Sequence, residues 1–115
     1  MTTLLIVDDS PEMRRLVRQV AARACDEVFE CEDGDEVLAA FDSHRPDWVL
    51  MDVEMKRVDG LSATAALLRL RPAAKVVIVT KYTDAETRRA AREAGALHFF
   101  GKDDLLSLRS LIQSH

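Results

Sequence analysis

Short apolar runs alternate with helical patterns along the chain, and this alternation limits the fold more than any other feature. The runs are TLLIV (Thr3–Val7), VFEC (Val28–Cys31), WVLM (Trp48–Met51), KVVIV (Lys75–Val79) and ALHFF (Ala96–Phe100). Apolar residues recur at helical spacing after each run, as Leu105, Leu108, Leu111 and Ile112 do after the fifth. A strand followed by a helix, repeated five times, predicts an α/β fold in which a parallel sheet has helices on both faces.

The apolar character of the runs also predicts their order in the sheet. The first, third and fourth runs are apolar almost throughout, as strands covered on both faces must be. The second and fifth runs contain Glu30 and His98, which suit the edges of a sheet. With right-handed crossovers, these constraints predict the order 2-1-3-4-5, a flavodoxin-like, doubly wound sheet of five strands. The 115 residues fit one domain, which we expect to span 1–115.

Local signals predict where two of the helices begin and end. Ser10 is a helix-capping residue and Pro11 suits the first helical position, so a helix is expected to start there. The segment TDAE (Thr83–Glu86) has the pattern of a capping box for a later helix, which Gly95 is expected to end.

Composition excludes several classes of function. The net charge of −4 and the pI near 5.3 give no electrostatic footprint for nucleic acid. No apolar run approaches the roughly 20 residues needed to span a bilayer, and the N-terminus does not resemble a signal peptide. The two cysteines have no metal-binding or redox spacing, which suits a reducing compartment. We therefore expect a cytoplasmic protein that binds neither a membrane nor DNA directly.

Polar side chains follow four of the expected strands, at the edge of the sheet where ligands bind in such folds. They are Asp8 and Asp9 after the first strand, Asp52 after the third, Thr80 after the fourth and Lys102 after the fifth. Three carboxylates so close together repel one another, and Mg²⁺ would relieve that repulsion because it prefers oxygen ligands. The charges of three acids, one Mg²⁺ and one lysine sum to zero. Such a site could accept a phosphoryl group on one carboxylate.

At these residues the sequence resembles the receiver domains of two-component response regulators. The matching segments are IVDDSPEMRRL, VLMDVEMKRVDG, VVIVT and HFFGKD, and the resemblance covers the chain from end to end. The resemblance implies that Asp52 takes a phosphoryl group from a histidine kinase or a histidine phosphotransfer protein. The metal ligands that it implies are Asp8, Asp9, Asp52 and the backbone carbonyl of Glu54, which together would hold Mg²⁺.

The resemblance also implies how phosphorylation changes the protein. Lys102 would contact the phosphoryl group, Thr80 would swing toward it, and Phe99 would rearrange in step. A downstream protein is expected on the surface of the fourth helix, the fifth strand and the fifth helix, and a homodimer formed on phosphorylation is left open. The fourth helix is rich in alanine and carries Arg88, Arg89 and Arg92, so it is expected to be loosely held and to select the partner.

Two departures from the family pattern bear on the site. Lys56 stands where a proline is usual, so the loop after Asp52 is expected to be less rigid. Lys81 stands where a small residue is usual, and it can reach Glu54 if the third and fourth strands are neighbours. We therefore expect an exposed Glu54–Lys81 ion pair at the mouth of the site, where it would slow both loading and loss of the phosphoryl group.

Two other functions remain open at this point. One is a Mg²⁺-dependent phosphohydrolase with an aspartyl intermediate, which would share the acid chemistry but would need a substrate pocket. The other is a receiver-like binding module that is never phosphorylated, which Lys81 favours because it could block Asp52. The interpretation that we carry forward is a phosphorylation-dependent switch that assists its own phosphorylation and slow dephosphorylation but is not a turnover enzyme.

Overall fold

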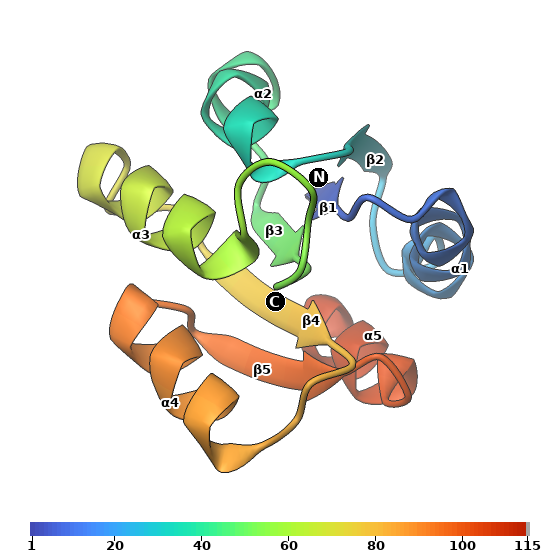
Figure 1. The fold of residues 1–115 in the computed structure, drawn as a ribbon. Coiled ribbons are helices and arrows are strands. Elements are labelled where there is room, and N and C mark those ends of the chain that lie inside the picture. Colours follow the sequence, from blue (N-terminus) through green and yellow to red (C-terminus); the bar gives the residue numbers. More distant parts are fainter. Residues whose placement is uncertain (115) are drawn as a thin grey trace.

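Five strands form one parallel sheet in the computed structural model, which describes residues 1–114 (Figure 1). They are β1 (Thr3–Val7), β2 (Glu27–Cys31), β3 (Trp48–Met51), β4 (Val76–Thr80) and β5 (His98–Gly101). Their order is β2-β1-β3-β4-β5, which confirms the predicted flavodoxin-like arrangement. The chain adds β2 on one side of β1 and then crosses to β3 on the other side, so the topological switch point, where this class of fold binds its ligands, lies between β1 and β3.

Helices cover both faces of the sheet, as the alternation predicted (Figure 1). They are α1 (Pro11–Ala21), α2 (Val37–His44), α3 (Gly60–Leu70), α4 (Ala85–Ala94) and α5 (Leu105–Gln113), with a short 3-10 helix η1 (Gly34–Glu36) before α2. The helices α1 and α5 pack together on one face, and α2, α3 and α4 lie on the other. Among the described helices, none combines the length and the apolar character that crossing a membrane requires.

The core consists of two layers, one on each face of the sheet. Successive residues of a strand point to opposite faces, so Leu4 and Ile6 pack under α1 and α5 while Leu5 and Val7 pack under the other helices. All four side chains are almost completely buried. This two-sided burial explains why the central strands are apolar at every position rather than at alternate ones.

The predicted start is correct for α1, and for α4 the predicted end at Gly95 is correct while the capping residue lies one position later than predicted. The Ser10 hydroxyl accepts the backbone N–H of Met13 at 3.2 Å, and Pro11 opens the helix as expected. The cap of α4 is Asp84 rather than Thr83, because its carboxylate accepts the backbone N–H of Thr87 at 3.0 Å. Aspartate is at least as good a cap as threonine, and it lies nearer the first helical turn.

Three strands differ from the predicted runs: β2 begins one residue earlier, at Glu27, β4 is shifted by one residue toward the C-terminus, and β5 begins two residues later and ends one residue later. The strand β5 starts at His98 because the backbone N–H of Ala96 still bonds Ala91 at the end of α4, where Gly95 has φ of 105°. Glycine adopts this left-handed conformation without the steric cost that other residues incur. The neighbouring strand β4 ends at Thr80, one residue after the end of the apolar run. Thr80 is in register with Gly101 of β5.

Candidate functional site

Three aspartates gather at the carboxyl ends of β1 and β3. Val7 and Met51 are paired in the sheet, and the backbone N–H of Asp52 donates to the Val7 carbonyl at 2.9 Å. This pairing places Asp52 next to Asp8 and Asp9, and carboxylate oxygens from the three residues all lie within 4.8 Å of one another. Asp8 and Asp52 are buried, whereas Asp9 is partly exposed. The sequence-based grouping of these three acids is therefore what the fold produces.

Lys102 lies against two of the three carboxylates, those of Asp8 and Asp52. Its Nζ lies 3.0 Å from Asp8 Oδ2 and 3.3 Å from Asp52 Oδ1. The backbone N–H of Lys102 donates to the Thr80 carbonyl at 2.9 Å, which extends the β4–β5 pairing by one residue and aims the lysine at the acids. The backbone of Asp8 is fixed as well, because Arg14 Nη1 donates to its carbonyl oxygen at 2.6 Å.

The electrostatics of the site show that one cation does not satisfy the carboxylates. Burial and the neighbouring charge of Asp8 raise the pKa of Asp52 from 3.8 to about 6, although Lys102 and the backbone N–H of Val53 act in the opposite direction. Burial acts to lower the pKa of Lys102, but the hydrogen bond to Asp8 and the charge of Asp52 outweigh it and raise that pKa. Lys102 therefore stays charged, whereas the ionised form of Asp52 is energetically unfavourable in the folded protein.

The donor set fits a hard divalent cation. Three carboxylates whose oxygens surround one point offer the ligands that Mg²⁺ prefers, and two of them are partly compensated by Lys102. Asp8, Asp9 and Asp52 are the residues that would hold the ion, and the Glu54 carbonyl stays a prediction. Burial raises the pKa of Asp52 and the charge of Asp8 adds to this, and a divalent charge at this point would offset the repulsion from Asp8.

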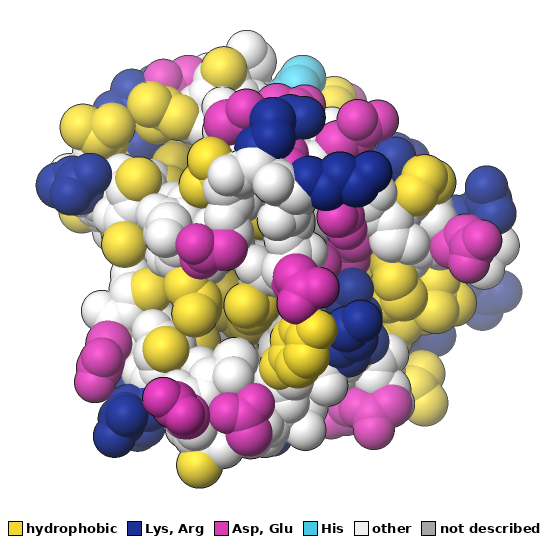
Figure 2. All heavy atoms as spheres, viewed as in Figure 1, with side chains coloured by type: hydrophobic (Ala, Val, Ile, Leu, Met, Phe, Trp, Pro, Cys, Tyr) yellow, Lys and Arg dark blue, Asp and Glu magenta, His cyan; other side chains and the backbone are white. Residues whose placement is uncertain are grey.

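The acids open into a pocket of about 360 Å³. Its lining consists of Asp9, Ser10, Met13, Asp52, Glu54, Lys81, Tyr82 and Lys102. Glu54 and Lys81 therefore do lie at the mouth of the site, where the sequence predicted them. Acidic and basic side chains are interspersed with apolar ones over the face of the molecule drawn in Figure 2.

The predicted ion pair between Glu54 and Lys81 is wrong. The Tyr82 hydroxyl donates to Glu54 Oε2 at 2.7 Å, and Lys81 Nζ lies over the Tyr82 ring, 5.4 Å from its centroid. The tyrosine, and not the neighbouring lysine, is therefore the partner of the Glu54 carboxylate. Tyr82 is the residue that sequence reasoning missed, and its only sequence signal is an aromatic two positions after Thr80.

Thr80 and Phe99 do not belong to the described lining of the pocket. Thr80 is fully buried, and its hydroxyl oxygen accepts the backbone N–H of Tyr82 at 3.1 Å. Phe99 is partly buried on the face of the sheet that α4 covers, and the Arg88 guanidinium lies 4.6 Å from its ring centroid. The two switch residues predicted from sequence are thus on adjacent strands.

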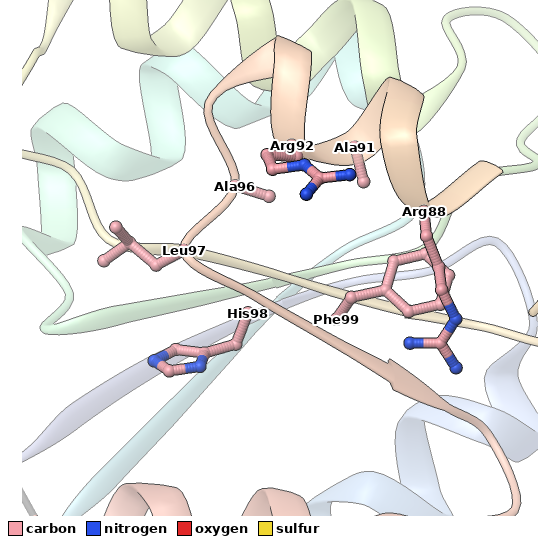
Figure 3. Close-up of a pocket in the computed structure, with 7 residues that line it drawn as sticks. All are labelled: Arg88, Ala91, Arg92, Ala96, Leu97, His98 and Phe99. Atoms are coloured by element: carbon pink, nitrogen blue, oxygen red, sulfur yellow. The ribbon is translucent and has the colours of Figure 1, made fainter. Parts of the chain in front are cut away.

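A second hollow of about 280 Å³ lies between α4 and β5 (Figure 3). Its lining combines basic and apolar side chains: Arg88, Ala91, Arg92, Ala96, Leu97, His98 and Phe99. Arg89, on another side of α4, pairs with Glu93 instead. The inward stripe of α4 is alanine, as the sequence indicated, and Ala91 is its buried member.

Comparison with known families matches residues 4–113 to the response regulator receiver domain. The chain is 36% identical over 104 residues to a protein-glutamate methylesterase/protein-glutamine glutaminase of Halobacterium salinarum, which covers 89% of this chain but only 30% of that protein. It is 32% identical over 93 residues to the chemotaxis protein CheY of the same organism, covering 81% of this chain and 78% of that one. The chain thus spans about a third of the length of the methylesterase that it matches.

The fold agrees with a solved structure over nearly the full length of both chains. The Vibrio cholerae chemotaxis protein CheY4 superimposes with a TM-score of 0.88 at 26% identity, covering 99% of this chain and 98% of the other.

Proposed function

The chain belongs to the response regulator receiver domain family, and we propose that it is a signalling switch in which Asp52 accepts a phosphoryl group. One observation carries this proposal: the buried Asp52 carboxylate lies 3.3 Å from the ammonium group of Lys102 and beside two further aspartates, and it lines an open pocket. This is an arrangement that a single carboxylate nucleophile needs, because the charge of a bound phosphoryl group requires compensation.

The transfer step is assigned to Asp52 Oδ2. Oδ1 already accepts the Val53 N–H at 2.9 Å and lies against Lys102, so it is held in place while the other oxygen attacks. A new O–P bond forms at Oδ2 as the P–N bond of a phosphohistidine in the donor protein breaks. The electron pair of that bond leaves with the imidazole, which takes up a proton. We propose a histidine kinase or a histidine phosphotransfer protein as the donor.

Asp8, Asp9 and Asp52 would hold Mg²⁺ in this scheme, with the Glu54 carbonyl as a further ligand. When bound, the ion supplies positive charge against the phosphoryl oxygens, which Lys102 alone cannot balance. Lys102 gives a charge-assisted hydrogen bond to one phosphoryl oxygen, and Thr80 donates from its hydroxyl to another.

We propose that the signal leaves the site along β4 and β5. A phosphoryl group adds roughly −1.5 to −2 charges, so Thr80 moves toward it and Phe99 moves into the space that the threonine leaves. Phe99 lines the hollow against α4, and its ring lies under Arg88. The surface of α4, β5 and α5 would therefore change, and we place a downstream protein there. A homodimer on phosphorylation would use the same surface.

Tyr82, Glu54 and Lys81 are proposed to set the rates rather than to perform the chemistry. Tyr82 and Glu54 are joined by a hydrogen bond and line the same pocket as Asp52, and Lys81 Nζ lies over the tyrosine ring, so we propose that the pair forms a strap over the pocket. This strap would slow the entry of small donors and of the water that hydrolyses the phosphoryl group. We accordingly infer a switch with a persistent phosphorylated state, working in the cytoplasm, and not an enzyme with turnover.

Intact mass after incubation with acetyl phosphate and Mg²⁺ tests the proposed function. The wild type should gain the mass of one phosphoryl group, and the Asp52→Asn variant should gain none. Asp42→Asn is the matched control because Asp42 pairs with Arg71 on the surface, away from the site. Absence of a label on the wild type would favour the unphosphorylated binding module. Continuous hydrolysis of small phosphate esters would favour the phosphohydrolase.

A further inference from the structure

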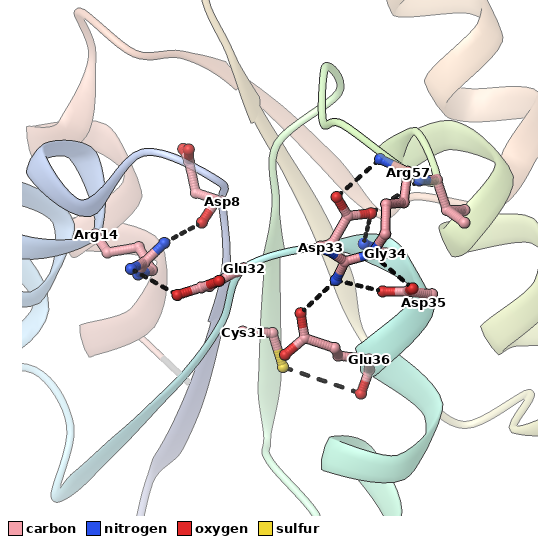
Figure 4. Close-up of polar contacts among 10 residues, drawn as sticks. Asp8, Arg14, Cys31, Glu32, Asp33, Gly34, Asp35, Glu36 and Arg57 are labelled. Carbon is pink, nitrogen blue, oxygen red and sulfur yellow. Dashed lines mark hydrogen bonds and ion pairs between the residues drawn. The ribbon is translucent and has the colours of Figure 1, made fainter.

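Asp33 is a buried carboxylate outside the acidic group, and its partners are backbone atoms of a distant loop. It is 1% exposed and lies between β2 and η1. Its Oδ1 accepts the N–H groups of Gly34 and Val58, each at 2.8 Å, and its Oδ2 accepts the N–H of Arg57 at 2.9 Å (Figure 4). Two of these three bonds therefore join the end of β2 to the segment that follows Asp52.

The exposed side chain of Arg57 also links the loop after Asp52 to η1. Its Nε and Nη2 donate to the two oxygens of Asp35 at 2.8 and 3.0 Å, and Nη2 also reaches Glu36 at 3.1 Å (Figure 4). The approach is close enough that a Cβ on Gly34 would lie 2.7 Å from the Val58 carbonyl oxygen. Glycine at this position lets the two segments touch.

The loop held in this way, residues 53–59, begins and ends at the candidate phosphoacceptor. At its start the Val53 N–H orients Asp52 Oδ1 at 2.9 Å. At its end the Gly60 N–H donates to the Val53 carbonyl at 2.7 Å, and a Cβ on Gly60 would clash with the Asp52 carbonyl oxygen. Both ends of this loop therefore contact the backbone or the side chain of Asp52.

We propose that Asp33 is a positioning residue for the phosphoacceptor, acting with Arg57 through the loop 53–59. The role rests on the proposed function, since it concerns how Asp52 and the metal ligands are held. The sequence indicated a less rigid loop because Lys56 stands where a proline is usual. The two hydrogen bonds that the backbone N–H groups of Arg57 and Val58 donate to the buried Asp33 carboxylate supply, from another part of the chain, the constraint that a proline would have supplied locally.

The direct test is Asp33→Asn, which keeps the size of the side chain but not its acceptors. An amide has one oxygen, so its NH₂ group must replace either Oδ1 or Oδ2 and then faces a backbone N–H. The loop therefore loses at least one hydrogen bond to residue 33. Asp42→Asn is the matched control, because it also breaks an Asp–Arg contact of the α2 region, 2.7 to 2.8 Å in length, without touching the loop.

Two measurements separate positioning from a general loss of stability. We expect the Mg²⁺ dissociation constant, measured by calorimetry on folded protein, to rise about tenfold in Asp33→Asn, as for other supports of metal ligands, and to stay unchanged in Asp42→Asn. The first-order loss of the phosphoryl label should change in Asp33→Asn alone. Both are measured under conditions in which each variant is fully folded, because a smaller folded fraction would itself raise the apparent dissociation constant.

Equal values in the two variants would overturn the proposal. If Asp33→Asn does not fold, Arg57→Ala decides, because it removes the outer fastening and leaves the backbone bonds in place. Unchanged Mg²⁺ affinity and label lifetime in Arg57→Ala would then overturn it. If the wild type binds Mg²⁺ but takes no label, the proposed phosphoacceptor function is wrong. The Mg²⁺ dissociation constants then still test whether Asp33 positions the metal ligands. If the wild type binds no Mg²⁺, there is nothing to position and Asp33 has no such role.

Discussion

Replacing Asp52 by asparagine should stabilise the metal-free protein at neutral pH. Burial and the charge of Asp8 raise the pKa of Asp52 to about 6, from an ordinary value of 3.8. Asparagine has almost the same shape and no charge, so it removes the anion that the folded site tolerates poorly. Replacing a buried side chain usually destabilises a protein. Replacing a functional group whose charge opposes folding has the opposite effect and increases the free energy of unfolding.

The magnitude follows from the difference between the two pKa values. An acid with a raised pKa binds its proton more tightly in the folded state, so its contribution to stability is complete below pH 3.8 and is lost as pH rises to about 6. At about 1.4 kcal/mol per pH unit, this amounts to roughly 3 kcal/mol. The variant also loses the contact with Lys102, so we expect a net gain of about 1–3 kcal/mol at neutral pH.

Urea unfolding in the presence of a chelator measures this gain. Trp48 is 2% exposed and reports the transition by fluorescence. Near pH 7.5 Asp52→Asn should unfold at higher urea than the wild type, and near pH 4 the two midpoints should converge because Asp52 is then protonated. Excess Mg²⁺ should reduce the difference, since it stabilises the wild type more than the variant.

Asp42→Asn serves as the control of opposite sign. The hydrogen bond from Arg71 lowers the pKa of Asp42, so this carboxylate contributes stability above its ordinary pKa and loses it as pH falls. Asp42→Asn should therefore leave stability unchanged or reduced near pH 7.5. If Asp52→Asn behaves in the same way, with no gain at neutral pH, Asp52 is not an unfavourable buried anion and the electrostatic account of the site is wrong.

Three further changes test other parts of the structure. Tyr82→Phe removes the hydroxyl that bonds Glu54, so loading from acetyl phosphate and loss of the label should both rise more than about twofold by timed mass spectrometry, and unchanged rates would exclude the strap. Gly60→Ala brings a Cβ against the Asp52 carbonyl and should cost about 1–3 kcal/mol or more by urea unfolding, whereas a neutral effect would mean that the loop yields. Ser10→Ala removes the cap of α1 and should cost about 1 kcal/mol by the same assay, and no loss would show that the 3.2 Å hydrogen bond contributes nothing.

The fold was predictable because its main determinants are local or pairwise. Continuous apolar runs such as Trp48–Met51 require burial on two faces, and only a central parallel strand gives that. The order of the strands then brings Asp8 and Asp52 together, since the pairing of β1 with β3 leaves no other place for them. Helix boundaries were harder to predict because adjacent residues can both cap a helix. The cap of α4 is Asp84, although Thr83 is also a capping residue.

The contacts around the site could not be predicted in the same way. Whether Glu54 pairs with Lys81 or with Tyr82 depends on the path of two loops, which no periodic pattern encodes. Asp33 illustrates the same limit, because an aspartate before a glycine is typical of an exposed turn. Its burial, and its bonds to a loop more than twenty residues away, arise only when η1 and the loop 53–59 are packed together.

The central claim is that Asp52 itself carries the phosphoryl group. Borohydride reduces an aspartyl phosphate to homoserine, so treatment after incubation with acetyl phosphate and Mg²⁺, followed by peptide sequencing by mass spectrometry, identifies the modified residue. We expect homoserine at position 52, and none when Mg²⁺ is withheld by a chelator. Homoserine at position 8 or 9 instead, or equal labelling without the metal, would contradict the account.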